Sequence, residues 1–133
     1  MKDCMSDFDT ELVIEILHQI KSSCDLIVSR VEHIITYSDF IKNDAGLEKL
    51  DAVSMQLIAI GESIKNLDKI TDYEILIKYP EFEWKKAMAM RDIISHHYFD
   101  LNPEIVFDVC KNEISRLSTL LDEIIDDIEN YKS

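Results

Sequence analysis

Residues 107–131 read FDVCKNEISRLSTLLDEIIDDIENY, and this stretch decides the fold class. Its apolar positions recur three and four residues apart, which is the period of one face of an α-helix. Asn102 can cap such a helix, Pro103 suits its first turn, and Glu104 complements the helix dipole there. The pattern therefore predicts a helix of about 40 Å that ends near residue 131. The periodic positions are Phe107, Cys110, Ile114, Leu117, Leu121, Ile124, Ile128 and Tyr131.

Two earlier stretches carry the same helical periodicity, one from Val13 to Ile34 and the other from Leu50 to Leu67. Two glycines and two prolines are fewer than a sheet with tight turns usually needs. We therefore expect one all-α domain over residues 1–133, an up-and-down bundle of three long helices plus shorter ones. The shorter helices are expected around residues 38–42, from residue 71 or 72 to 79, and from a start between residues 81 and 84 to about residue 96.

The chain of 133 residues is acidic, with 27 Asp and Glu against 14 Lys and Arg and a formal net charge of −13. A protein that coats nucleic acid needs a basic surface, so this composition excludes that class, and no DNA binding is expected. The charge is not uniform: the balance is −7 over residues 1–64, +1 over 65–91 and −7 over 92–133. The middle window is compatible with RNA held in a narrow groove, where the local field matters more than the total.

Cysteine usage and hydropathy indicate a cytoplasmic protein that does not associate with membranes. Cys4, Cys24 and Cys110 are odd in number and form no CxxC pair, which argues against a secreted disulfide framework. The N-terminal residues lack the apolar region of a signal peptide. No stretch approaches the roughly 20 apolar residues that span a bilayer.

Residues 90–100, MRDIISHHYFD, concentrate side chains that can carry out chemistry. The guanidinium of Arg91 can bind a phosphate through two hydrogen bonds, and the imidazole of His96 can exchange protons near neutral pH. Together they suit attack of an RNA 2′-hydroxyl on the adjacent phosphate without a metal ion, with Arg91 stabilising the phosphorane. The two residues lie about 140° apart around a regular helix. Their convergence requires the helix to end or distort near His96, or a second chain to supply one of them.

Two residues of the second long helix are candidates to support Arg91. Glu62 can orient Arg91 across the bundle, although an ordinary exposed carboxylate is the alternative. Gly61 costs a helix about 1 kcal/mol relative to alanine, so we expect it to permit close helix approach near the site.

Two further features have competing interpretations. His96 and His97 with Asp100 could form a metal site, but adjacent histidines point in different directions and no His-x-x-x-His or Cys pair supports them, so no metal is expected. Trp84, beside Phe82 and two lysines, could stack on bases. We favour the interpretation that it plugs the end of a bundle.

The order of short motifs along the chain resembles that of HEPN-domain toxins of the HepT type. The arrangement Arg-x-x-x-x-His-x-Tyr at Arg91, His96 and Tyr98 looks like the motif of that family. The resemblance covers about residues 45–125. Its other parts, in the family's order, are Asp51-Ala52-Val53, Ile60-Gly61-Glu62, Tyr79-Pro80-Glu81, Trp84, Met90-Arg91-Asp92 and Tyr98-Phe99.

The resemblance implies a two-fold homodimer that is the toxin of a type II toxin–antitoxin system. Arg91 and His96 would be its metal-independent endoribonuclease residues at the dimer cleft, and we take Asp92 and Glu62 as supporting residues. His97 occupies a position where the family varies. It is a second proton-transfer group, a solvated neighbour, or the catalytic histidine in place of His96; the position of Tyr98 favours His96.

The resemblance also implies a partner, a minimal nucleotidyltransferase that acts as the antitoxin and transfers AMP from ATP onto Tyr98. A bulky anionic group two residues from His96 would block the cleft and repel RNA phosphate. The toxin itself would need no cofactor. The alternative is a non-cleaving HEPN module that binds a nucleotide or a nucleotidyltransferase partner, because it would share the motif. A plain helical scaffold does not account for the motif segment.

Overall fold

The computed structural model describes residues 9–132 of the chain, and every regular element in this range is helical. The long helices are α1 (Thr10–Arg30), α2 (Asp44–Ile70) and a continuous helix built from α4 (Pro103–Asp108), the π-helical turn η5 (Val109–Glu113) and α5 (Ile114–Lys132). These bounds confirm the predicted all-α bundle with three long helices. The shorter elements are α3 (Trp84–His96) and the 3₁₀ turns η2 (Tyr37–Phe40), η3 (Leu76–Lys78) and η4 (Tyr98–Asp100). Cys4 and the side chain of Tyr131 lie outside the described part.

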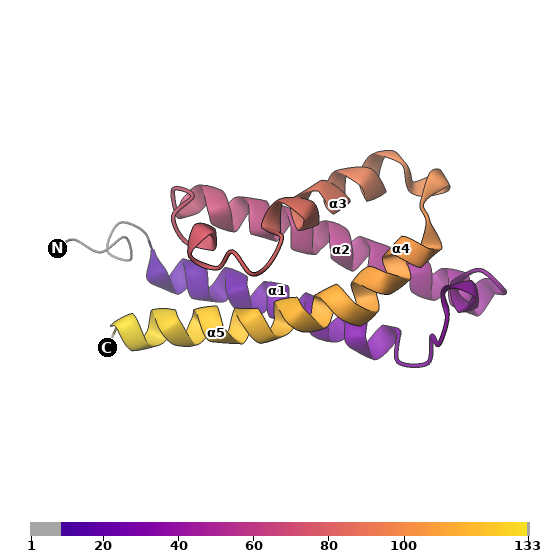
Figure 1. Cartoon of the computed structure of the whole chain (residues 1–133), viewed down its shortest axis with the longest axis horizontal. Coiled ribbons are helices and arrows are strands. Elements are labelled where there is room, and N and C mark those ends of the chain that lie inside the picture. The colour runs from indigo at the N-terminus through magenta and orange to yellow at the C-terminus, as the bar shows by residue number, and fades with distance from the viewer. Residues whose placement is uncertain (1–8, 133) are drawn as a thin grey trace.

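Helix α2 holds the bundle together because it packs against α1 on one side and α3 on the other, while α1 also packs against α5. The four successive helices α1, α2, α3 and α4–α5 alternate in direction, so α2 and the α4–α5 helix run the same way, as Figure 1 shows. Helix α3 lies along α2 and does not close tightly against α5. The bundle is therefore open along one side, between α3 and the helix formed by α4, η5 and α5. No helix within residues 9–132 is long and apolar enough to cross a membrane.

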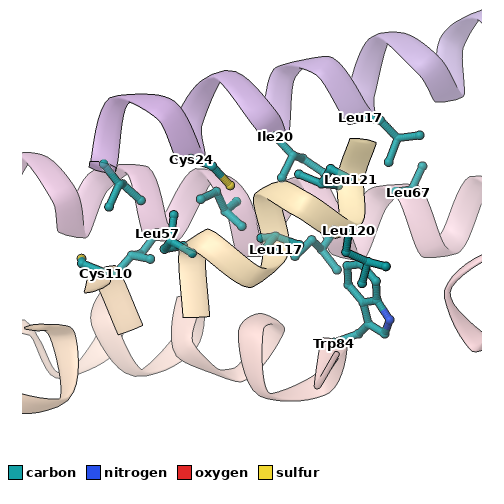
Figure 2. Close-up of a cluster of buried hydrophobic side chains, with 14 of the residues drawn as sticks. Leu17, Ile20, Cys24, Leu57, Leu67, Trp84, Cys110, Leu117, Leu120 and Leu121 are labelled. Atoms are coloured by element: carbon teal, nitrogen blue, oxygen red, sulfur yellow. The ribbon is translucent and has the colours of Figure 1, made fainter. Parts of the chain in front are cut away.

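One apolar core fills the interior between the helices. Figure 2 shows Leu17 and Cys24 of α1, Leu57 of α2, and Leu117 and Leu121 of α5 pointing into the same space. The predicted apolar stripes supply these side chains, and burial of each large one stabilises the fold by about 1.5–3 kcal/mol. The stripes therefore face the core as expected.

Burial also decides the chemistry of the cysteines. Cys24 and Cys110 are free and buried in the core. Their burial raises the pKa of both thiols to about 12. Both side chains are therefore neutral at physiological pH and act as apolar core residues rather than nucleophiles.

Trp84 begins α3 and is 8% exposed, within the same core. Its indole N–H donates to the carbonyl oxygen of Tyr79 at 2.9 Å, and its ring meets Phe82 edge-on with centroids 4.8 Å apart. A ring held in this way offers no free face to a base. The part of the prediction that is confirmed is that Trp84 packs inside the bundle.

Two helix ends differ from the sequence-based expectation. Helix α1 ends at Arg30, not Ile34, yet Ile34 stays buried because a further turn, in which its N–H bonds the Val31 carbonyl, keeps the three-residue spacing. The short helix expected from residue 71 is only η3. Thr71 instead ends α2 by donating its hydroxyl to the Leu67 carbonyl, and Asp72 and Tyr73 then adopt positive φ angles of 54° and 62°, which stop a helix.

The π-helical turn η5 corrects the predicted stripe of the last long helix. Val106 is fully buried there, whereas Phe107 is only partly buried. A π turn closes with i→i+5 hydrogen bonds and is wider than an α turn, so the buried positions around Cys110 recur four residues apart on both sides. The apolar pattern alone did not indicate this extra residue.

We expect Leu121→Ala to lower the free energy of unfolding by about 2–5 kcal/mol, because it leaves a cavity at a fully buried position. Leu26→Ala is the matched control on the exposed side of α1 and should cost about 0.5 kcal/mol or less. Urea denaturation measures both. Equal losses in the two variants would contradict the assignment of the core.

Candidate active site

The candidate site begins where α2 and α3 touch most closely, at Gly61 and Arg91. A methyl group at position 61 would lie 2.6 Å from Arg91 Cβ and 3.1 Å from the Ala87 carbonyl oxygen. Real Cβ atoms do not approach this closely, so only glycine fits without displacing α3. The predicted close approach at Gly61 is confirmed, and it sets the stem of Arg91 against the backbone of α2.

Two carboxylates hold the Arg91 guanidinium. Its Nε lies 2.5 Å from Oε1 of Glu62 as an ion pair, without the alignment of a hydrogen bond, and its Nη1 donates to Oδ1 of Asp92 at 2.9 Å. Glu62 therefore contacts Arg91 from the neighbouring helix, as the sequence suggested. Among the described residues, Nη2 has no partner, so one donor edge is open to a ligand. Glu62 and Asp92 orient the guanidinium, and solvent can still reach Arg91 because one third of its side chain is exposed.

The hydrogen bond from Arg91 lowers the pKa of the Asp92 carboxyl below its ordinary value, and the nearby charges of Lys65 and His96 lower it further. Asp92 is therefore ionised at neutral pH. It lies one turn before His96 on the same helix. Asp92 thus connects the arginine and the histidine of the motif electrostatically.

The histidines lie at the end of α3. His96 is its last residue, and the backbone N–H of His97 donates to the Ile93 carbonyl to close the final turn. Both side chains are exposed, and neither imidazole has a hydrogen-bond partner among the described residues. Since α3 is regular up to His96, Arg91 and His96 remain about 140° apart around it. Helix α3 ends at His96, as the convergence of the two side chains would require. A single chain nevertheless does not bring Arg91 and His96 onto one face.

The turn η4, which follows α3, brings Tyr98 close to α2. Its hydroxyl donates to Oδ1 of Asp51, near the beginning of α2. Because α2 and α3 are antiparallel, the pairs Glu62–Arg91 and Asp51–Tyr98 follow one register along the line where the helices meet. Arg91 and Tyr98 thus both contact residues of α2.

Asp51 is a candidate functional residue that the sequence alone did not single out. The sequence places it in a motif, but only the antiparallel register of α2 and α3 brings it to Tyr98. An antiparallel alignment of α2 with α3 would have paired carboxylates of α2 with positions 91 and 98, and this pairing could have pointed to Asp51.

Apolar side chains surround the site. Phe99, beside Tyr98 in η4, is fully exposed, and Ile93 and Ile105 are about half exposed. A groove of about 540 Å³ runs alongside, between α3 and the α4–α5 helix. Its walls include Leu57, Met90, Ile105, Val109 and Leu117, with Glu83, Lys86, Glu104 and Glu113 among its polar residues. Exposed apolar surface of this kind is typical of a protein interface.

Within residues 9–132, no cluster of three His, Cys, Asp or Glu side chains could hold a metal ion. His96, His97 and Asp100 in particular do not form such a cluster.

The fold and the site define a class of protein. The all-α bundle, with Arg91 and His96 on α3 and Tyr98 in the following turn η4, agrees with the resemblance to HEPN-type domains. The chain belongs to the HepT-like ribonuclease family, whose model matches residues 16–124. The resemblance drawn from the motifs is thus confirmed over most of the chain.

Individual relatives agree with the family match. A candidate RNase of Methanocaldococcus jannaschii is 38% identical over 95 residues, which cover 71% of this chain and 73% of that protein. A candidate RNase of Caldanaerobacter subterraneus subsp. tengcongensis is 33% identical over 82% of this chain and 90% of its own length. A second one from Methanocaldococcus jannaschii is 33% identical over 85% of this chain and 90% of that protein. No solved structure matches the chain significantly.

Gly61→Ala tests the close contact that positions Arg91. We expect it to lower the free energy of unfolding by about 1–3 kcal/mol, because the methyl group meets Arg91 Cβ. Helix propensity alone would raise stability by about 1 kcal/mol. Ala59→Gly, at an exposed position of α2, is the matched control and should lose about 1 kcal/mol. A Gly61→Ala variant more stable than the parent in urea would refute the contact.

Proposed function

We propose that the chain is the toxin of a type II toxin–antitoxin pair and that it cleaves RNA internally without a metal ion. The observation that carries this proposal is the Arg91 guanidinium, held by α2 with one donor edge open, five residues before the exposed imidazole of His96. Membership of the HepT-like ribonuclease family and the candidate RNases among its relatives support it.

In the proposed reaction, the 2′-oxygen of RNA attacks the adjacent phosphorus and the bond to the 5′-oxygen breaks. His96 exchanges the proton, either by taking it from the 2′-hydroxyl or by giving one to the 5′-oxygen. Arg91 binds a non-bridging phosphate oxygen through Nη2 and stabilises the charge of the phosphorane. Lys65, close enough to Asp92 to act on its pKa, adds positive charge in the least acidic part of the chain.

A second copy of the chain completes the site in this proposal. Within one chain Arg91 and His96 face different directions, so the facing copy brings its own groups across a two-fold axis. The cleft then contains both a base and an acid, and His97 is available as the second proton-transfer group. Fully exposed Phe99 and the apolar groove beside α3 offer surface for such a homodimer.

The proposed antitoxin is a minimal nucleotidyltransferase that uses ATP to place AMP on Tyr98. The Tyr98 side chain is partly exposed, which makes its hydroxyl reachable by a partner enzyme. An AMP group would add a negative charge and a large volume two residues from His96. Both would keep RNA phosphate out of the cleft.

The alternative function, a non-cleaving module that binds a nucleotide or its nucleotidyltransferase partner, has one observation in its favour. Glu62 and Asp92 already neutralise the Arg91 guanidinium, and a phosphate must compete with both. Growth and modification experiments separate the two functions.

Expression of the wild type should arrest growth, and His96→Ala should abolish the arrest, because loss of a general acid or base lowers the rate by about 10²–10⁴-fold. His18→Ala, on the exposed face of α1, is the matched control and should remain toxic. Loss of toxicity in His97→Ala alone would move the catalytic role to His97. A folded but harmless wild type would leave the binding module as the function.

Co-expression with the proposed antitoxin should raise the intact mass of the chain by one or more AMP units. Tyr98→Phe should remove the increase, because it lacks the acceptor oxygen and keeps the ring. An increase that survives Tyr98→Phe would show that another residue is the acceptor.

A further inference from the structure

The hydroxyl of Tyr98 is not a free surface group, because it donates its hydrogen bond to Oδ1 of Asp51. The two residues come from different elements, the turn η4 and the first third of α2, and are 47 positions apart in the chain. Both are exposed. A reagent can therefore reach the tyrosine oxygen while the carboxylate is still in contact with it.

A tyrosine hydroxyl is a poor nucleophile at neutral pH, since its ordinary pKa is about 10. Transfer of a phosphoryl-type group to a hydroxyl is commonly assisted by a carboxylate that accepts the hydroxyl proton. Asp51 already accepts the hydrogen bond that such a base must accept. The carboxylate that such a base requires is therefore in contact with the Tyr98 hydroxyl within a single chain.

We propose that Asp51 is the general base that this chain supplies for its own modification at Tyr98. The inference rests on the proposed function, in which Tyr98 receives AMP from ATP. The Tyr98 oxygen attacks the α-phosphorus, a new oxygen–phosphorus bond forms, and the bond to the β-phosphate oxygen breaks so that pyrophosphate leaves. The Tyr98 proton passes to Asp51 and then to solvent.

The other carboxylate on this side of α2 is not equivalent. Glu62 lies about three turns further along α2 and pairs with the Arg91 guanidinium. Titratable residues close to the pair in the chain include Glu48, one turn before Asp51 on α2, and His97 and Asp100, which flank Tyr98. None of the three has a hydrogen bond to the Tyr98 hydroxyl. Asp51 is thus the base that the structure assigns to this oxygen.

The test is the initial rate of AMP transfer onto the full-length chain by the proposed antitoxin with ATP, followed by intact mass. Asp51→Asn keeps the size of the side chain and removes the basic carboxylate. Glu48→Gln, one turn away on the same helix, is the matched control because it removes the same charge. Asp51→Glu tests rescue by another carboxylate, and Tyr98→Phe reports any transfer to other residues.

We expect Asp51→Asn to be modified about 100-fold more slowly than the wild type at pH 7, while Glu48→Gln keeps the wild-type rate and Asp51→Glu recovers part of it. The rate of Asp51→Asn should then rise roughly tenfold per pH unit between pH 7 and 9, because ionisation of the tyrosine itself replaces the missing base. A carboxylate that only positions the ring would leave the pH profile parallel to that of the wild type.

Wild-type rates in Asp51→Asn, or a parallel pH profile, would overturn the role of Asp51 and leave Tyr98 as the acceptor. Modification that persists in Tyr98→Phe, or no modification of the wild type, would overturn the AMP acceptor itself and the inference with it. The two failures are therefore distinguishable in one set of measurements.

Discussion

The close contact of α2 and α3 at Gly61 is the constraint on which the candidate site depends. Position 61 has no room for a side chain, so the backbone of α2 lies directly against the stem of Arg91. The same contact places Glu62 beside the guanidinium and fixes the antiparallel register of the two helices. That register in turn brings Tyr98 to Asp51. The absence of a side chain at position 61 thus helps to position both Arg91 and Tyr98.

The opening beside α3 follows from the same arrangement. A helix held mainly by α2 leaves its other side uncovered, and the groove between α3 and the α4–α5 helix has apolar walls. Phe99, which follows Tyr98 in the turn η4, is also fully exposed. A protein with a net charge of −13 presents little that attracts nucleic acid elsewhere. The uncovered region offers apolar surface against which the proposed second copy would pack.

Much of this architecture can be predicted from the sequence, because a periodic apolar stripe determines which side of a helix faces the core. The stripes predicted three long helices, and the cost of a glycine inside one of them predicted the close contact at Gly61. The π turn η5 was not predictable, since one extra residue leaves no compositional trace. The Asp51–Tyr98 contact was missed because it depends on the register between two helices. The catalytic roles of Arg91 and His96 stay predictions.

In the proposed reaction, Arg91 and His96 cleave RNA by attack of its own 2′-hydroxyl. The most direct measurement is the chemistry of the new RNA ends after incubation with the purified chain in excess EDTA. The account predicts 2′,3′-cyclic phosphate and 5′-hydroxyl ends, produced by the wild type and absent with His96→Ala. Ends that carry 3′-hydroxyl and 5′-phosphate groups, or cleavage that EDTA abolishes, would contradict it.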